Sequence, residues 1–221
     1  MMTRRITQLL IGLAMYGISL AMFIRAGLGL DPWDVFHQGL AVKLGWSMGT
    51  VVIVVSFLVL LLWIPLRQMP GFGTLANAVL VGVFADVGLA LIPSFSHLGG
   101  QIAMLAGAVL LNGIASACYI GARLGPGARD GLMTGLARRT GWSVRLSRTL
   151  IEVVVLASGF ALGGTVGVGT VVYALSIGPL VQLLLPRFMV PEKAAAGVPA
   201  VDAAPDDARA GDAEPEAAAK A

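Results

Sequence analysis

The chain has 221 residues, of which 57% are hydrophobic and only 12% are charged, and its formal net charge at pH 7 is +3. Soluble domains normally carry about 25% charged residues, so this composition argues against a water-soluble fold and predicts an all-α integral membrane protein in the lipid bilayer. The arginines lie at the ends of apolar runs, where they indicate membrane topology and not nucleic-acid binding.

The first apolar run lies near residues 6–24, directly after Arg4 and Arg5. A transmembrane helix needs about 20 mostly apolar residues, and this run is longer than the apolar core of a usual signal peptide. We therefore predict a first membrane span that stays in the mature protein.

A short helix is predicted over residues 32–44, in the connector that follows. Asp31 can cap it, Pro32 suits its first position, and Asp34 lies in the first turn, where the helix dipole favours an acid. Aromatic and aliphatic side chains recur at helical spacing, with His37 off that stripe. A helix of about 12 residues is only about 18 Å long, so it cannot cross the bilayer alone.

Two further spans are predicted near residues 48–66 and 74–92, and the second of them contains Asp86. An ionisable group in hydrocarbon is costly unless it is paired or hydrated. Asp86 is therefore a candidate for a substrate or ion site, and the alternative is a carboxylate near a helix end paired with arginine.

The second half of the chain repeats the first at an offset of 96 residues without a gap. Leu28, Gly29 and Asp34 align with Leu124, Gly125 and Asp130. The same shift aligns the Gly-Trp-Ser segments at 45–47 and 141–143 and places Gly82 opposite Gly178. Paired matches of Trp, Asp and Gly at one offset indicate a duplication, with a first repeat over 1–95 and a second over 96–190.

Three more spans are predicted near residues 101–121, 146–162 and 170–185, with a short helix over 128–141 after the first of them. Glu152 lies in the fifth span, where Arg148, four residues earlier, is its obvious partner. Asn77 and Asn112 could hydrogen-bond between helices. We expect the glycines at 29 and 125 in turns and those at 82 and 178 in helix packing.

Basic residues predict the topology, because cytoplasmic loops are rich in arginine and lysine. Eleven of them lie in the termini and in the connectors after the second and fourth spans, against only Arg25 and Lys43 in the connectors on the other side. Both termini should therefore lie in the cytoplasm. Since each repeat has three spans, the second repeat would be inverted relative to the first, as in many secondary transporters.

Two interpretations of the short helices stay open. In one, each lies in the headgroup region with its aromatic face in the lipid. In the other, both enter the membrane from opposite sides, so that their N-termini, with Asp34 and Asp130, approach a shared central site. Beyond residue 190 the chain is rich in Ala, Pro and Asp, which predicts a disordered acidic cytoplasmic tail over 191–221.

Enzyme chemistry is not predicted, nor is a cofactor or a metal site. Only His37 and His97 are present, too far apart for a local metal motif, and a nucleotide or nucleophile motif is lacking. The single cysteine, Cys118, lies in an apolar run.

The stretch 25–40 and the Gly-Trp-Ser-Met-Gly at 45–49 resemble the YczE/YyaS/YitT-like bacterial integral membrane proteins. Similar features recur at 124–133, at 141–143 and in the Gly-Val-Gly-Thr at 167–170. The resemblance covers residues 6–186 and implies a bacterial cytoplasmic-membrane protein of five or six helices. It brings no substrate or site residue with it.

Two functions follow as hypotheses. The first is a small-molecule permease or secondary transporter with a site at the interface of the two repeats, for which the candidate residues are Asp34, Asp130, Asp86, Glu152 and His37. The second is a non-transporting scaffold or accessory protein that binds a protein partner, or a second copy, through the arginine-rich segment 123–148.

Overall fold

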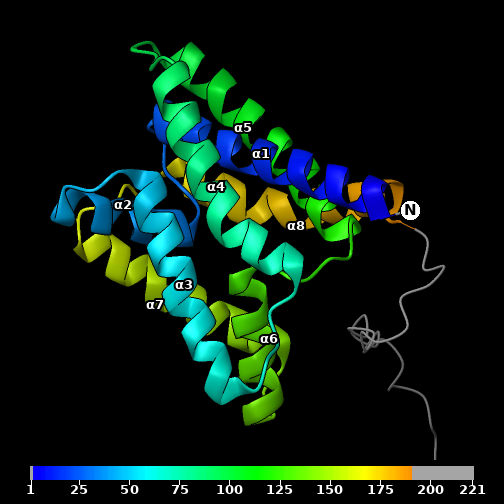
Figure 1. The fold of residues 1–221 in the computed structure, drawn as a ribbon. Coiled ribbons are helices and arrows are strands. Elements are labelled where there is room, and N and C mark those ends of the chain that lie inside the picture. The colour runs from blue at the N-terminus through cyan, green and yellow to red at the C-terminus, as the bar shows by residue number, and fades with distance from the viewer. Residues whose placement is uncertain (1, 191–221) are drawn as a thin grey trace, which may run out of the picture. The chain divides into compact units, whose positions relative to one another are not determined.

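The computed structural model describes residues 2–190, in which the regular elements are eight α-helices and no strand (Figure 1). Their bounds are α1 Met2–Ala26, α2 Pro32–Leu44, α3 Met48–Leu66, α4 Phe72–Leu91, α5 Leu98–Gly121, α6 Ala128–Thr140, α7 Val144–Ala161 and α8 Val168–Phe188. The predicted all-α fold is confirmed. The predicted acidic tail at 191–221 lies outside the described residues.

Five of these helices, α1, α3, α4, α5 and α8, are long and apolar enough to cross a membrane. The predicted fifth span, near residues 146–162, corresponds to α7, which is not among them. Within its 18 residues α7 carries Arg145, Arg148 and Glu152, and charged side chains inside a bilayer are costly. The described chain is therefore a helical membrane protein with five candidate spans, and the predicted total of six spans is not confirmed.

Both predicted short helices are present. α2 begins as expected, with an Asp31 carboxylate oxygen accepting from the Asp34 N–H at 2.8 Å and Pro32 in the first turn. It ends at Gly45, whose φ of 67° is left-handed and suits glycine. α6 ends in the same way at Gly141, with φ 75°.

Helix starts recur at the offset of 96 residues, since α5, α6, α7 and α8 begin 96 positions after α1, α2, α3 and α4. Contacts between the halves recur as well. The N–H of Gly73 donates to the Leu124 carbonyl at 2.7 Å, and the N–H of Gly169 donates to the Leu28 carbonyl at 2.7 Å. Each half thus reaches the connector of the other half through equivalent residues.

α1 and α5 pack against each other in antiparallel directions. Near the middle of α1, Gly12 lies against Tyr119, and a Cβ at Gly12 would be 2.8 Å from the Tyr119 nitrogen. Farther along α1, Ser19 contacts Asn112. Position in α1 therefore rises as position in α5 falls. α4 packs beside α1 and α8 beside α5, so these four helices form one group (Figure 1).

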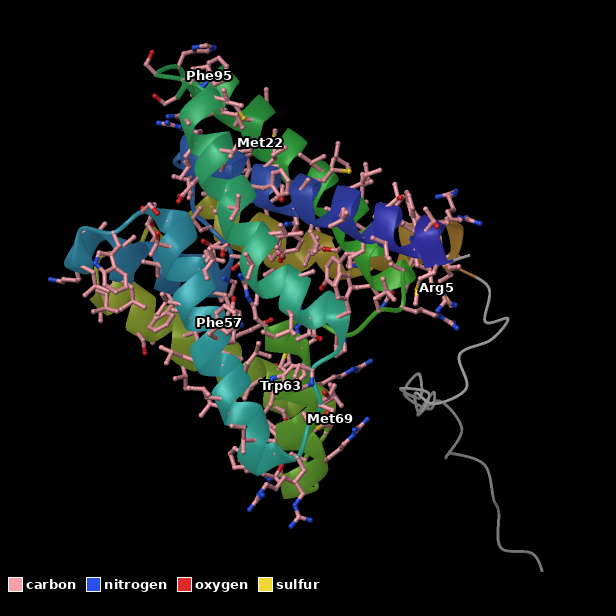
Figure 2. The ribbon with its side chains drawn as sticks, viewed as in Figure 1. Arg5, Met22, Phe57, Trp63, Met69 and Phe95 are labelled. Atoms are coloured by element: carbon pink, nitrogen blue, oxygen red, sulfur yellow. The ribbon has the colours of Figure 1, made fainter. Side chains whose placement is uncertain are left out.

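Each short helix packs mainly on a long helix of the other half of the chain, since α2 packs on α7 and α6 packs on α3. Trp63 of α3, labelled in Figure 2, donates from Nε1 to the Ala128 carbonyl at 3.0 Å. Gly131 leaves room for this ring, since a Cβ there would be 2.0 Å from Trp63 Cζ2. At the equivalent place in the other half, a Cβ at Gly159 would be 2.4 Å from the Phe36 nitrogen.

Three of the four glycines assigned to turns or packing act as predicted. Gly29 and Gly125 have φ of 115° and 128° and lie against Thr170 and Thr74, respectively. Gly82 packs against α3, where its Cβ would be 2.5 Å from the Gly49 carbonyl oxygen. Gly178 is the exception. A Cβ there would meet no described atom within 4 Å, because α8 does not approach α7 as α4 approaches α3.

Candidate functional site

The first turns of α2 and α6 meet through an ion-pair network that joins the two halves. Arg129 of α6 lies with Nη1 3.4 Å from Asp31 Oδ2 and with Nη2 3.1 Å from Asp34 Oδ1. Both aspartates are buried, with 4% and 2% of their surface exposed, and the Arg129 side chain is 22% exposed. One guanidinium therefore serves two buried carboxylates from the opposite half.

Trp33 and His37 of α2 complete what we call the charged cluster, which comprises Asp31, Trp33, Asp34, His37 and Arg129. The Arg129 guanidinium carbon is 5.4 Å from the centroid of the Trp33 ring, a distance at which a cation is attracted to an aromatic face. His37 Nδ1 lies 3.1 Å from Asp34 Oδ1. His37 Nε2 and Trp33 Nε1 are buried and make no hydrogen bond within residues 2–190.

Burial controls the protonation of the acids in the cluster. It raises the pKa of Asp31 to about 6, an effect that the Asp34 charge strengthens and Arg129 opposes. Burial also raises the pKa of Asp34, against the opposing effect of Arg129. Because Asp31 titrates close to neutrality, the cluster can exchange a proton near physiological pH.

The two bases behave differently from each other. Burial and the nearby Arg129 charge lower the pKa of His37 to about 3, so this imidazole is neutral at pH 7. Burial alone would lower the pKa of Arg129, but Asp31 and Asp34 raise it above its usual value. Arg129 therefore stays charged. A neutral imidazole has one donor and one acceptor nitrogen, and the tautomer of His37 decides whether Nδ1 donates to Asp34 or accepts from it.

A small polar cavity lies beside Arg129 and has a volume of about 50 Å³. Its polar lining consists of Tyr16, Ser56, Asn77, Tyr119, Arg129 and Asp130. The Tyr119 hydroxyl donates to Asp130 Oδ2 at 3.1 Å, and the rings of Tyr16 and Tyr119 pack edge to face at 6.0 Å. A cavity of this size holds a water molecule or a small ion.

Of the predicted site residues, Asp34 and His37 lie together in the charged cluster, and Asp130 lies in the adjoining cavity. In one of the two open interpretations of the short helices their N-termini meet, and the contacts of Arg129 with Asp31 and Asp34 agree with that part of it. Asn77 lines the same cavity.

Asp86 makes its contacts elsewhere, at the start of α3. Its Oδ2 accepts from the Ser47 hydroxyl at 2.6 Å, and its Oδ1 accepts from the Gly49 N–H at 2.7 Å. A carboxylate at a helix N-terminus is stabilised by the helix dipole. The alternative interpretation expected a paired carboxylate near a helix end. Asp86 is paired at a helix end, but its partner is the N-terminus of α3 and not an arginine.

Glu152 also stands apart from the cluster. Its Oε1 lies 2.9 Å from Arg148 Nε, one helical turn earlier, and the Arg148 side chain is 55% exposed. The predicted pairing with Arg148 is confirmed. Asn112 joins helices as predicted, because its amide donates to the Ser19 hydroxyl of α1 at 2.9 Å and its oxygen lies 3.4 Å from the Tyr173 hydroxyl of α8.

Sequence reasoning missed three members of the cluster, of which Trp33 was predicted only as part of the aromatic stripe of the short helix. Asp31 was predicted only as a helix cap, a role it does fill, and Arg129 only as a topology signal. The shift of 96 aligns Trp33 with Arg129, and these two aligned residues lie next to each other in the structure. The alignment therefore carried a sign of this contact. The tyrosines of the cavity gave no such sign.

Metal binding is not built into the described residues. Within residues 2–190, no three His, Cys, Asp or Glu side chains are arranged to hold a metal ion. The polar groups that converge here are acceptor carboxylates, tyrosine hydroxyls, one imidazole and one guanidinium donor.

Comparison with known proteins places the chain among bacterial relatives along most of its length. A family of unknown function, DUF6198, matches residues 3–186. An uncharacterized protein of Haemophilus influenzae is 36% identical over 82% of this chain and 84% of its own length. The uncharacterized membrane protein YczE of Bacillus subtilis is 34% identical over 78% and 80%, respectively.

The uncharacterized protein YyaS of Bacillus subtilis is 26% identical over 80% of this chain and 90% of its own length. The resemblance to YczE and YyaS is therefore confirmed. No solved structure matches the chain.

Proposed function

We propose that this chain, which belongs to the family of unknown function DUF6198, is a secondary transporter that moves a small solute through a site between two inverted repeats. The observation that carries the proposal is the pairing of Arg129 from one half with Asp31 and Asp34 from the other. Its setting is the bacterial cytoplasmic membrane, with both termini in the cytoplasm. The proposed role is transport and not catalysis.

The inverted arrangement is supported by helix direction and by the recurring contacts. α1 and α5 are antiparallel, and the two turn hydrogen bonds to Leu28 and Leu124 are equivalent. In this arrangement α7 crosses the bilayer as the counterpart of α3. The ion pair between Arg148 and Glu152 lowers the cost of placing two of its charges there.

The proposed orientation is supported by two arginines in strained backbone. Arg67 and Arg123 both have φ of 53°, which is rare for residues other than glycine. Their counterparts at the offset of 96 are Gly163 and Gly27, with φ of 101° and 68°. The two arginines lie in the connector between α3 and α4 and in the connector between α5 and α6, which meet through the hydrogen bond from Gly73 to Leu124. Cytoplasmic loops retain positive charge, which accounts for the strain.

Rocking of one repeat against the other is the usual basis of alternating access in such folds. Here it would pull Arg129 away from Asp31 and Asp34. A buried charge that loses its partner is destabilised by several kcal/mol, so separation requires a proton or a solute to replace Arg129. The charged cluster thereby couples movement of the halves to binding.

The two halves differ at their edges in the way that alternating access requires. In the first half, Asp86 holds α4 against the start of α3, and Gly82 allows close contact with Gly49. In the second half, a Cβ at Gly178 would meet no described atom within 4 Å outside its own helix, and Gln182, one turn on, is exposed. The edge between α3 and α4, here called the closed edge, is therefore closely packed, and the equivalent edge between α7 and α8 is not.

Flux in sealed proteoliposomes tests the proposal. Small cationic, anionic, zwitterionic and neutral solutes are supplied in turn under an imposed pH gradient, and transport currents and internal pH are recorded. We expect flux of one class, lost in Asp34→Asn and retained in Asp86→Asn. Absence of flux for every class by folded protein would contradict the proposal.

A second candidate function is favoured by the exposed arginines around the turn between α6 and α7. Arg138 and Arg145 are both exposed there, as a binding surface for another protein would be. Purification after gentle detergent extraction separates this scaffold role from transport. A stoichiometric partner that is lost on changing Arg138 and Arg145 to Ser would favour the scaffold.

A further inference from the structure

The charged cluster is built like a binding site whose ligand is a side chain of the protein itself. Asp31 and Asp34 present carboxylate oxygens to the two terminal nitrogens of the Arg129 guanidinium, and the Trp33 ring lies 5.4 Å from its central carbon. Two carboxylates and an aromatic face are the groups that recognise a planar, hydrogen-bonding cation. All three come from one half of the chain, and the cation comes from the other.

Two buried ring nitrogens of α2 have capacity that Arg129 does not use. His37 Nε2 and Trp33 Nε1 form no hydrogen bond within the described chain, although their residues are only 1% and 6% exposed. The two rings are neighbours, with centroids 6.3 Å apart. Buried polar groups normally have a partner. Trp33 Nε1 can donate, and His37 Nε2 can donate or accept according to its tautomer, so these two ring nitrogens are available to a ligand larger than a guanidinium.

Arg129 is the member of the charged cluster best placed to move. Its side chain is the most exposed of the three ion-paired side chains in that cluster, at 22%, and it borders the cavity of about 50 Å³. Asp130, the next residue, lies in the same cavity and offers Arg129 a carboxylate outside the cluster. Exchange of one monovalent cation for another leaves the charge around Asp31 and Asp34 unchanged, which avoids the cost of an unpaired buried carboxylate.

We propose that Asp31, Asp34 and Trp33 bind the guanidinium or primary-amine group of a small organic cation, and that Arg129 occupies this site when the ligand is absent. The inference rests on the proposed function, because it names the class of solute that the transporter carries. Ligands with N–H donors fit the site. Quaternary ammonium ions and sodium have no N–H donors to give to the two carboxylates, and they fit less well.

Removal of the internal ligand provides the first test. Arg129→Ala should lower the thermal unfolding midpoint of the purified protein in detergent, and low-millimolar guanidinium or methylguanidinium should restore most of the loss. Tetramethylammonium and sodium at equal ionic strength should not. Arg145→Ala, which changes an exposed arginine, is the matched control and should show neither effect. Equal restoration by sodium, or none by guanidinium, would overturn the inference.

A second measurement on otherwise intact protein covers the case in which Arg129→Ala does not fold. Methylguanidinium is titrated into the full-length protein while tryptophan fluorescence is followed. We expect a saturable change that disappears in Trp33→Phe and weakens at least tenfold in Asp34→Asn. An unsaturable signal, or one unaffected by both changes, would overturn the site. Flux of another solute class without methylguanidinium binding would leave transport standing and remove only this inference.

Discussion

The guanidinium of Arg129 lies over the ring of Trp33, its own counterpart at the offset of 96 residues, with 5.4 Å between the guanidinium carbon and the ring centroid. Equivalent positions in the two halves thus meet face to face, one as a cation and the other as an aromatic surface. The offset of 96 residues aligns the starts of α2 and α6, and at this position the two helices carry complementary side chains. Asp31 and Asp34 on the Trp33 side strengthen the same pairing.

Loss of the Arg129 charge should destabilise the fold. Arg129→Gln leaves Asp31 and Asp34 buried without a counter-charge, and we expect the free energy of unfolding to fall by about 3 kcal/mol, the low end for a buried pair. Titration with denaturing detergent measures it. Arg145→Gln, at an exposed position, serves as control and should change stability little.

The same pair can be tested by combining variants. Asp34→Asn in the Arg129→Gln background should cost less than Asp34→Asn alone, because the carboxylate no longer has an arginine to lose. Additive effects of the two substitutions would show that the ion pair does not contribute to stability.

Asp31 should take up a proton as the pH falls through about 6. Its pKa is raised above that of the unfolded chain, so between about pH 4 and 6 the folded state binds a proton that the unfolded state does not. The contribution of Asp31 to stability therefore declines as pH rises through this window. His37 has the opposite sign, because its lowered pKa makes stability decline as pH falls below 6.5.

Infrared spectroscopy separates these titrations. The carbonyl band of a protonated carboxylic acid should appear in the wild-type protein as pH falls through about 6 and should be diminished in Asp31→Asn, which retains the capping oxygen. An unchanged band in Asp31→Asn would assign the proton to another residue.

Two glycines at equivalent positions should respond differently to alanine. Gly82→Ala places a Cβ 2.5 Å from the Gly49 carbonyl oxygen, and overpacking of this kind costs about 1–3 kcal/mol. Gly178→Ala meets no described atom within 4 Å and should leave unfolding unchanged or slightly improve it, since alanine favours helix. Equal loss of stability in both variants would mean that α8 packs on α7 in the same way as α4 packs on α3.

Asp86 should act on the closed edge and not on the charged cluster. Asp86→Ala removes the acceptor for Ser47 and Gly49 and should lower the free energy of unfolding by about 1 kcal/mol, as for a lost helix cap. Asp86→Asn keeps one acceptor oxygen and should lose less. Neither substitution should move the Asp31 carboxyl band. A shift of that band in Asp86→Ala would connect the edge to the cluster.

Much of the fold could be read from sequence because its signals are local. Proline after aspartate and glycine at the end placed the α2 boundaries at 32 and 44, as observed. α7 was harder, since Arg145, Arg148 and Glu152 interrupt an apolar run that continues beyond them. The length of the apolar run alone predicted a span, because the sequence does not show which partners would offset the cost of the charges.

The site was predicted in part for a physical reason. Asp34 and His37 are unusual residues in an apolar chain and could be recognised one by one. Arg129 gains its role only from the meeting of α2 with α6, a contact between residues 95 positions apart. From the sequence alone, Arg129 and Arg145 are both interpreted as topology signals. The tertiary contacts distinguish them, because Arg129 is paired with two buried acids, whereas Arg145 is exposed on α7.

Access to the cavity tests the transport account most directly, because it needs no knowledge of the solute. Ser56 lines the cavity, and Ser56→Cys is introduced after Cys118 has been changed to Ala. Ser19→Cys, at a residue with no exposed surface, is the control. Both variants are treated with a membrane-impermeant thiol reagent in right-side-out and in inside-out vesicles. We predict that Ser56→Cys is labelled from both sides and Ser19→Cys from neither. Labelling of Ser56→Cys from one side alone, or from neither, would contradict alternating access through this site.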